Sequence, residues 1–88
     1  MTSTSLITGA SSGLGTEYAR QLARRGDRLV LVARDVGRME TMIDELTRAG
    51  AAGVEVLGAD LLDADGLATV VERLTDPQRP VEMLVNSA

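Results

Sequence analysis

Hydrophobic residues along the chain fall into two patterns that alternate with each other. Short apolar runs at 5–8, 29–33, 54–57 and 81–85 are typical of strands buried in a sheet. Between these runs, apolar residues recur every three or four positions, which is typical of one face of a helix. The three predicted helical stripes are Leu14, Tyr18 and Leu22 with Ala19 and Ala23; Met39, Met42, Ile43 and Leu46; and Leu67, Val70, Val71 and Leu74.

Glycine and aspartate residues mark the ends of the predicted helices. Gly26 and Gly50 follow the first two stripes, at the position where glycine commonly terminates a helix. Asp35 and Asp63 precede the second and third stripes, where a carboxylate can cap the first backbone N–H groups. The order along the chain is therefore strand and helix in strict alternation, with strands at both ends.

This order predicts an α/β fold, a Rossmann-like three-layer parallel sheet with right-handed crossovers. The expected strand order is 3-2-1-4, with the first two helices on one face and the third on the other. One helix cannot cover a whole face of four strands, and the last strand is left as an apolar edge. The fold is incomplete as a free-standing domain, so we expect self-association and a homo-oligomer.

Composition restricts the chemistry that the chain can perform. Its nine basic residues are all Arg, and it has no His, no Cys and a single Tyr in 88 residues. These absences exclude a Ser-His-Asp triad, a zinc or haem site of the usual ligands and a phosphate loop that needs Lys. We therefore assign no metal ligand.

Charge and hydropathy argue against two kinds of partner. The net charge of −4 does not favour a broad nucleic-acid surface. The longest apolar run, 29–33, is far too short to cross a bilayer, and the first residues lack the pattern of a signal peptide. The absence of Cys is compatible with a reducing compartment, and we expect a cytoplasmic protein with no membrane partner.

The strongest functional signal is the segment 8–15, which joins the first strand directly to the first helix. Gly9 permits a tight turn, the missing side chain of Gly13 lets a pyrophosphate approach the backbone, and Gly15 permits close helix–strand packing. The helix start offers free N–H groups and a positive dipole end to phosphate oxygens. The alternative is a glycine turn that binds nothing, but its place in a βαβ unit favours a phosphate site. The predicted cofactor-binding residues of this segment are Gly9, Ser11, Ser12, Gly13, Leu14 and Gly15.

Three segments, each at the end of a strand, resemble motifs of the short-chain dehydrogenase/reductase family. Thr8-Gly9-Ala10-Ser11-Ser12-Gly13-Leu14-Gly15 resembles its TGxxxGxG loop, and Ala59-Asp60-Leu61 resembles its adenine-contacting segment. Asn86-Ser87-Ala88 resembles the start of its NNAG motif, with Ser87 in place of the second Asn. The resemblance covers all 88 residues but only the family's N-terminal, cofactor-binding part. It implies a nicotinamide dinucleotide as cofactor and adds Asp60, Leu61, Asn86 and Ala88 to the binding residues.

Two of these residues have a structural role to weigh beside cofactor binding. Asp60 can satisfy backbone N–H groups at the end of its strand, and this role stays open. Asn86 is expected to stabilise the central strands, because its amide can donate and accept at the same time.

The resemblance also implies an activity, which is hydride transfer between NAD(P)(H) and the carbonyl/alcohol pair of a small-molecule substrate. Family members use a Ser, a Tyr and a Lys, the last two in a Tyr-x-x-x-Lys pattern, usually with an Asn. Tyr18 is followed four residues later by Leu22, and its place on the apolar stripe predicts a packing residue. We therefore assign no catalytic residue and expect the 88 residues alone to be inactive.

The end of the second strand, Ala33-Arg34-Asp35, bears on the choice between NADP and NAD. An Asp near this point can bind the ribose hydroxyls of NAD, which would nominate Asp35. NAD-preferring family members carry their acid at the position that resembles Ala33, however, and Arg34 resembles the Arg of NADP-preferring members. A guanidinium can form paired, charge-assisted bonds to a phosphate. We therefore predict NADP, with NAD as the alternative and Asp35 as a helix cap.

Two classes of function remain. The first is the cofactor-binding part of an NADP(H)-dependent short-chain oxidoreductase, with residues 1–88 as the N-terminal part of a dinucleotide-binding Rossmann domain. In that case the catalytic and substrate-binding part is absent from the sequence. The alternative is a non-catalytic nucleotide-binding or regulatory module. The first is favoured because the last motif breaks off at Asn-Ser-Ala and the last strand is an unpaired edge.

Overall fold

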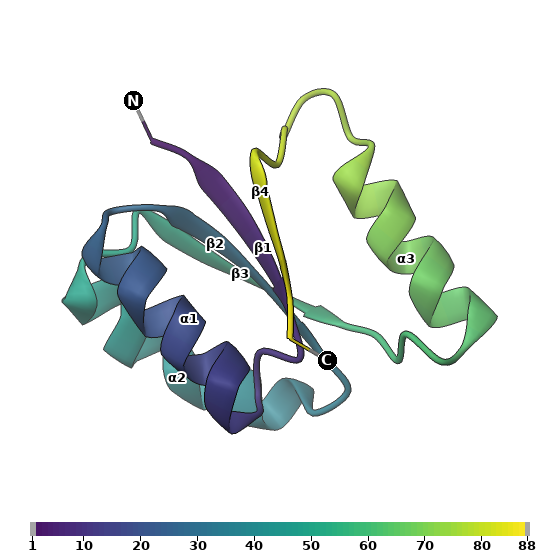
Figure 1. Ribbon diagram of the computed structural model, residues 1–88, viewed down its shortest axis with the longest axis horizontal. Coiled ribbons are helices and arrows are strands. Elements are labelled where there is room, and N and C mark those ends of the chain that lie inside the picture. Colours follow the sequence, from purple (N-terminus) through teal and green to yellow (C-terminus); the bar gives the residue numbers. More distant parts are fainter. Residues whose placement is uncertain (1, 88) are drawn as a thin grey trace.

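Four parallel strands form the centre of the structure, a computed structural model that describes residues 2–87 (Figure 1). The strands are β1 (Thr4–Thr8), β2 (Arg28–Ala33), β3 (Gly53–Gly58) and β4 (Met83–Asn86). Their order in the sheet is β3-β2-β1-β4, which confirms the predicted order. The helices between them are α1 (Gly13–Arg24), α2 (Val36–Ala49) and α3 (Ala64–Leu74).

The helices cover the two faces of the sheet unequally. Figure 1 shows α1 and α2 on one face and α3 alone on the other, as predicted. The strands β1 and β2 are buried on both faces, because alternate residues point to opposite cores. One core, under α1 and α2, includes Ile7, Leu29 and Leu31, and the smaller core under α3 includes Leu6 and Val30.

The helix ends follow the predicted chemistry. Gly26 has a φ of 91° and Gly50 a φ of 126°, so both glycines terminate their helices in the left-handed region. Asp35 accepts the backbone N–H of Arg38 at 2.9 Å and thereby caps α2. Asp63 caps α3 by accepting the N–H of Asp65 at 3.1 Å.

The orientation of α1 differs from the prediction. Leu14 is 63% exposed and Tyr18 is 40% exposed, so neither is a core residue. The buried residues of α1 are Ala19, Leu22 and Ala23, which the predicted stripe included, and Gly15, which it did not. The reason is steric: residues without a large side chain let the helix lie close to the sheet, and the bulkier side chains are turned to its flank. The prediction that Tyr18 packs in the core was therefore wrong.

The edge of the sheet at β4 also differs from its predicted bounds. Pairing begins at Met83, two residues later than expected, and extends to Asn86. The backbone N–H of Glu82 still donates to the Thr4 carbonyl at 2.9 Å, so the chain reaches the sheet before the strand begins. Met83 and Leu84 on this edge are exposed, as are Leu67 and Val71 on α3. One helix therefore leaves part of the second face uncovered, as expected.

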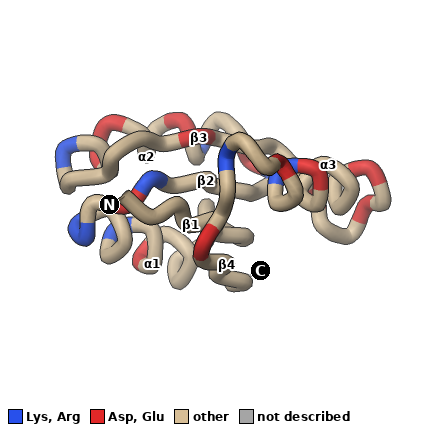
Figure 2. Tube along the Cα trace, turned by 90° about the horizontal axis from the view of Figure 1, so that it is seen from above, with Lys and Arg blue, Asp and Glu red and all other residues tan. Residues whose placement is uncertain are grey.

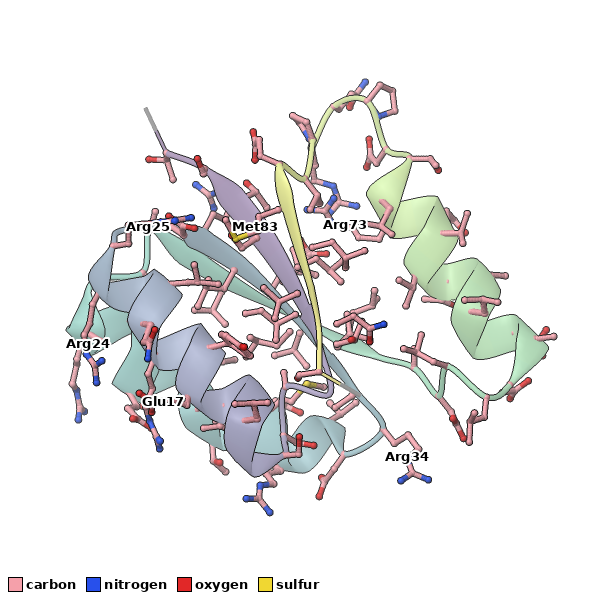
Figure 3. All side chains as sticks on the ribbon, viewed as in Figure 1. Glu17, Arg24, Arg25, Arg34, Arg73 and Met83 are labelled. Atoms are coloured by element: carbon pink, nitrogen blue, oxygen red, sulfur yellow. The ribbon has the colours of Figure 1, made fainter. Side chains whose placement is uncertain are left out.

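A buried guanidinium anchors α3 to the sheet. Arg73 lies between α3 and the strands (Figure 3), and it is 5% exposed. Its Nε donates to Glu55 of β3 at 3.0 Å, and its Nη1 donates to the Arg79 carbonyl at 2.7 Å. These bonds connect the end of α3, the loop after it and the edge strand β3. A buried charge is tolerated here because it is both paired and hydrogen-bonded.

Asp27 holds the amino end of the sheet together. It is 3% exposed, and its carboxylate accepts Ser5 Oγ of β1 at 2.8 Å and Arg25 Nη2 at 2.6 Å. Its backbone carbonyl accepts the N–H of Ala52 at 2.9 Å, just before β3. The hydrogen bond from Arg25, aided by that from Ser5, lowers the pKa of Asp27 below its ordinary value. Figure 2 shows basic positions of the chain close to the start of β1.

We predict that Asp27→Asn lowers the free energy of unfolding by about 1–3 kcal/mol at pH 7, because the bonds to a buried carboxylate are weakened. A group whose pKa is lowered by folding stabilises the fold above its unfolded pKa, and this contribution is lost as the pH falls through the folded pKa. The wild-type chain should therefore lose stability as the pH falls below about 4. Urea unfolding at pH 7 and at pH 3 measures both effects. Asp44→Asn, at an exposed site on α2, should alter neither the free energy of unfolding at pH 7 nor its decrease towards pH 3. Equal losses of stability in Asp27→Asn and Asp44→Asn would contradict the role assigned to Asp27.

Candidate cofactor-binding site

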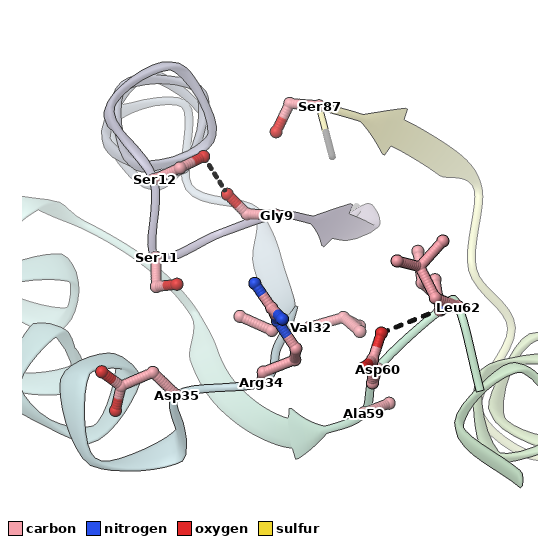
Figure 4. Close-up of a pocket in the computed structure, with 12 residues that line it drawn as sticks. Gly9, Ser11, Ser12, Val32, Arg34, Asp35, Ala59, Asp60, Leu62 and Ser87 are labelled. Carbon is pink, nitrogen blue, oxygen red and sulfur yellow. Dashed lines mark hydrogen bonds between the residues drawn. The ribbon is translucent and has the colours of Figure 1, made fainter.

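A cleft of about 520 Å³ lies at the carboxyl ends of β1, β2 and β3 (Figure 4). Its volume falls in the range of small-molecule sites. In open α/β sheets, ligands bind outside the carboxyl ends of the strands, at the point where the chain connections leave in opposite directions. Here that point is at β1, because β2 lies on one side of it and β4 on the other. The cleft occupies that place. It is lined by Gly9, Ser11, Ser12, Val32, Ala33, Arg34, Asp35, Ala59, Asp60, Leu61, Leu62 and Ser87.

The first wall of the cleft is the turn after β1. Gly9 has a φ of 64°, which a residue with a side chain rarely adopts. The Gly9 carbonyl accepts the backbone N–H of Ser12 at 3.1 Å and the Ser12 hydroxyl at 2.8 Å. The Ala10 N–H donates to the Val32 carbonyl at 3.1 Å, so the turn is also attached to β2. A tight turn closed by its own hydrogen bonds thus leads into α1.

The start of α1 opens towards the cleft. Ser12 is the N-cap, but its hydroxyl accepts no N–H of the first turn; it donates to the Gly9 carbonyl. The first N–H groups of the helix thus lack a side-chain acceptor, and they carry the positive end of the helix dipole. A Cβ built on Gly13 would meet no atom within 4 Å. No described atom outside the helix's own backbone therefore fills the space beside the Gly13 Cα.

Gly15 has the opposite environment to Gly13. A Cβ on Gly15 would overlap the Gly9 carbonyl oxygen and would come to 2.7 Å from the Ser87 hydroxyl. The first turn of α1 can therefore reach this position only because residue 15 has no side chain. This contact sets the direction in which the helix N-terminus points.

The second wall is the end of β2, where Arg34 and Asp35 have different roles. One carboxylate oxygen of Asp35 caps α2. Arg34 is exposed, and it has no ion-pair partner within residues 2–87. Figure 4 shows its side chain extending into the cleft between Ser11 and Asp60. Figure 3 shows that Arg34 lies far from Arg24 and Arg25 at the other end of the molecule.

The third wall follows β3. Asp60 Oδ1 accepts the N–H of Leu62 at 3.0 Å, which is the local backbone role that the sequence left open. Its backbone is held against α3, because a Cβ on Gly66 would overlap the Asp60 carbonyl. Leu61 is half-buried beside it, and Leu62 is exposed at the mouth of the cleft. Asp60 therefore shapes this wall whether or not it also contacts a ligand.

The end of β4 closes the back of the cleft. The Thr8 hydroxyl donates to Asn86 Oδ1 at 2.9 Å, so Asn86 joins the edge strand β4 to the central strand β1. The Ser87 hydroxyl donates to the Thr8 carbonyl at 2.7 Å. Ala88, which was also assigned to the site, lies outside the described residues.

The structure thus brings most of the predicted residues together. Of these, Gly9, Ser11, Ser12, Arg34, Asp60 and Leu61 line the cleft. Gly13, Leu14, Gly15 and Asn86 do not line it but belong to the turn, the helix start and the strand that border it. The lining residues that were not among the predicted binding residues are Val32, Ala33, Asp35, Ala59, Leu62 and Ser87. Ala59 and Ser87 belong to the segments that carried the resemblance, whereas Val32 is part of a continuous apolar run and Leu62 is an apolar loop residue with no motif of its own.

Two other kinds of site are absent from residues 2–87. No cluster of three or more His, Cys, Asp or Glu side chains with the geometry to hold a metal ion occurs there. Within the same residues, no helix is both long and apolar enough to cross a membrane.

Comparison with known proteins defines the family. Residues 3–88 match the model of the short chain dehydrogenase family, so the chain belongs to that family. A putative daunorubicin C-13 ketoreductase, DnrU, from Streptomyces sp. (strain C5) is 35% identical over 85 residues, which are 97% of this chain and 30% of that protein. This chain therefore spans about a third of the length of such relatives.

Solved structures agree with this assignment. The short-chain dehydrogenase from Sphingobium yanoikuyae, in complex with NADPH, is 47% identical with a TM-score of 0.89, covering 98% of this chain and 34% of that one. The L-sorbose reductase from Gluconobacter frateurii, in complex with NADPH and L-sorbose, is 32% identical with a TM-score of 0.87, covering 99% of this chain and 33% of that one. The fold and its order of elements are thus those of the cofactor-binding end of the family.

The two glycines at the start of α1 should respond differently to the same substitution. We predict that Gly15→Ala lowers the free energy of unfolding by about 1–3 kcal/mol, because the methyl group overlaps the Gly9 carbonyl. Gly13→Ala should change it by no more than about 0.5 kcal/mol, because the methyl group enters open space. Thermal or urea unfolding of the two variants measures the difference. Equal destabilisation would show that the tight contact at Gly15 is not a constraint on the fold.

Proposed function

We propose that this chain binds the adenosine and pyrophosphate part of NADP(H) and contributes that site to a short-chain oxidoreductase. The observation that carries the proposal is the combination of an open helix N-terminus at Gly13, which borders the cleft beside Ser12, with an uncommitted guanidinium at Arg34, which lines it. The first suits a pyrophosphate, and the second suits a phosphate on the ribose.

The residues of the cleft fit such a ligand. Backbone N–H groups from Gly13 onwards can donate to pyrophosphate oxygens, and the Ser11 hydroxyl can add a further bond. Asp60 retains a second carboxylate oxygen and Leu61 an apolar surface, which suit the edge and face of an adenine ring. These contacts come from three strand ends, so one extended ligand can satisfy them together.

Arg34 favours NADP over NAD. Asp35, the acid near the end of β2, uses one oxygen to cap α2. Ala33, the last residue of β2, has no polar side chain to bind the ribose hydroxyls. The Arg34 guanidinium can instead neutralise a 2′-phosphate through paired hydrogen bonds. The similar proteins from Sphingobium yanoikuyae and Gluconobacter frateurii are complexes with NADPH, which supports the same choice.

We further propose that residues 1–88 are the N-terminal part of a larger dinucleotide-binding domain. Bound NADP(H) would supply or accept a hydride in exchange with the carbonyl or alcohol group of a small substrate. The residues described here would bind and orient the cofactor, and the substrate site would come from the part of the family's length that this chain does not span. The exposed edge of β4, with Met83 and Leu84, is where that part or a second subunit would pack.

Cofactor preference can be tested at Arg34. Arg34→Ala should weaken NADPH binding about tenfold or more and leave NADH binding unchanged, because only NADPH carries the 2′-phosphate. Fluorescence titration with both cofactors gives the two dissociation constants. Arg48→Ala, an exposed Arg on α2 outside the cleft, is the matched control and should leave both constants unchanged. An equal loss of NADPH and NADH affinity in Arg34→Ala would contradict the proposal.

The 88 residues alone should bind cofactor without catalysing hydride transfer, because the sequence holds no Lys and therefore no Tyr-x-x-x-Lys pair. Incubation of the pure chain with NADPH and a panel of ketones, followed by absorbance, should show no consumption of NADPH above the buffer rate. Tyr18 is the only phenol in the chain, and the Tyr18→Phe variant should give the same rate of NADPH consumption as the unmodified chain. NADPH-dependent reduction of a ketone that persists after further purification would contradict the prediction that the 88 residues alone are inactive.

A further inference from the structure

Ser87, one residue beyond β4, contacts the start of the turn that joins β1 to α1. Its hydroxyl donates to the carbonyl of Thr8 at 2.7 Å, and Thr8 is the last residue of β1. We infer that Ser87 is a positioning residue, which orients the phosphate-binding turn through the Thr8 carbonyl. The identity of the ligand rests on the proposed function, whereas the hydrogen bond between Ser87 and Thr8 does not.

The geometry connects this bond to the turn in two steps. The carbonyl of Thr8 and the nitrogen of Gly9 belong to one planar peptide, so fixing the Thr8 oxygen fixes the plane in which Gly9 begins. The carbonyl of Gly9 is then the acceptor for both the N–H and the hydroxyl of Ser12, the N-cap of α1. A donor on β4 thereby influences the orientation of the first N–H groups of α1.

Packing supports the same role. The Ser87 hydroxyl oxygen lies 2.7 Å from the position that a Cβ on Gly15 would occupy. The hydroxyl, bonded to Thr8, therefore also lies close to the first turn of α1 at Gly15. Ser87 also lines the cleft, whereas Asn86 does not.

The roles of Asn86 and Ser87 are accordingly different. Asn86 accepts the Thr8 hydroxyl at 2.9 Å and thereby strengthens the pairing of β4 with β1. Ser87 binds the main chain of the same Thr8, which leads into the turn. Loss of the Ser87 hydroxyl should therefore disturb the turn more than it disturbs the sheet.

The chain offers a matched control at the other end of β1. The buried Ser5 hydroxyl, on β1, donates to Asp27 at 2.8 Å. Ser5→Ala and Ser87→Ala therefore each remove one hydroxyl whose hydrogen bond involves a residue of β1. Two ligands separate the parts of the site. NADPH contains the pyrophosphate that the turn would bind, and adenosine 2′-monophosphate keeps the adenine and the 2′-phosphate but lacks the pyrophosphate.

The experiment measures NADPH binding by fluorescence and adenosine 2′-monophosphate binding by displacement of NADPH, at a temperature where all variants are folded by circular dichroism. Ser87→Ala should weaken NADPH binding about three- to tenfold, the range that the loss of one hydrogen bond allows. It should leave adenosine 2′-monophosphate binding unchanged within about twofold. Ser5→Ala should lower the melting temperature and leave both affinities unchanged.

Equal loss of both ligands in Ser87→Ala, or equal loss of NADPH affinity in the two Ser variants, would overturn the positioning role. If the wild-type chain binds neither ligand, the proposed function fails, and amide hydrogen exchange of the free chain still tests Ser87. Ser87→Ala should then speed exchange at the Ser12 amide, which donates to Gly9, and leave the Arg38 amide at the α2 cap unchanged. An unchanged Ser12 amide would exclude the role.

Discussion

The close contact between the first turn of α1 and the turn after β1 is the constraint on which the site depends. Gly15 has no room for a side chain against the Gly9 carbonyl, and Gly9 itself has a positive φ. Together they let a helix begin almost immediately after a buried strand. Because the helix starts there, its free N–H groups open onto the cleft between the strand ends. A phosphate site therefore follows from backbone geometry before any charged side chain is considered.

The buried carboxylate of Asp27 and the exposed guanidinium of Arg34 lie at opposite ends of the sheet. At the amino end, Asp27 is buried and bonded to Ser5 and Arg25, and it connects three strands through its side chain and main chain. At the carboxyl end, Arg34 stays exposed in the cleft with no partner among the residues that the structure describes. Because no described carboxylate pairs with it, this guanidinium is available to form charge-assisted hydrogen bonds to a phosphate. The uncommitted guanidinium of Arg34 thus lies at the opposite end of the sheet from the buried carboxylate of Asp27.

Local patterns in the sequence predicted the order of elements, the strand order and the caps at Asp35 and Asp63, because periodicity and capping depend on neighbouring residues. They did not predict that Leu14 and Tyr18 turn away from the core. Their apolar spacing suggested burial, but the glycine and alanines on the adjacent face pack closer to the sheet. The contact of Ser87 with the turn was also beyond the sequence, since it depends on the register between β4 and β1.

The central claim is that one ligand occupies the space between the glycine turn and Arg34. A titration of the ¹⁵N-labelled chain with NADP⁺, followed by amide chemical shifts, tests it most directly. The account predicts the largest shifts in residues 9–15, with further shifts at Arg34 and Asp60. Shifts confined to Glu55, Arg73 and Arg79, which pair between β3 and the end of α3, or none in residues 9–15, would contradict it.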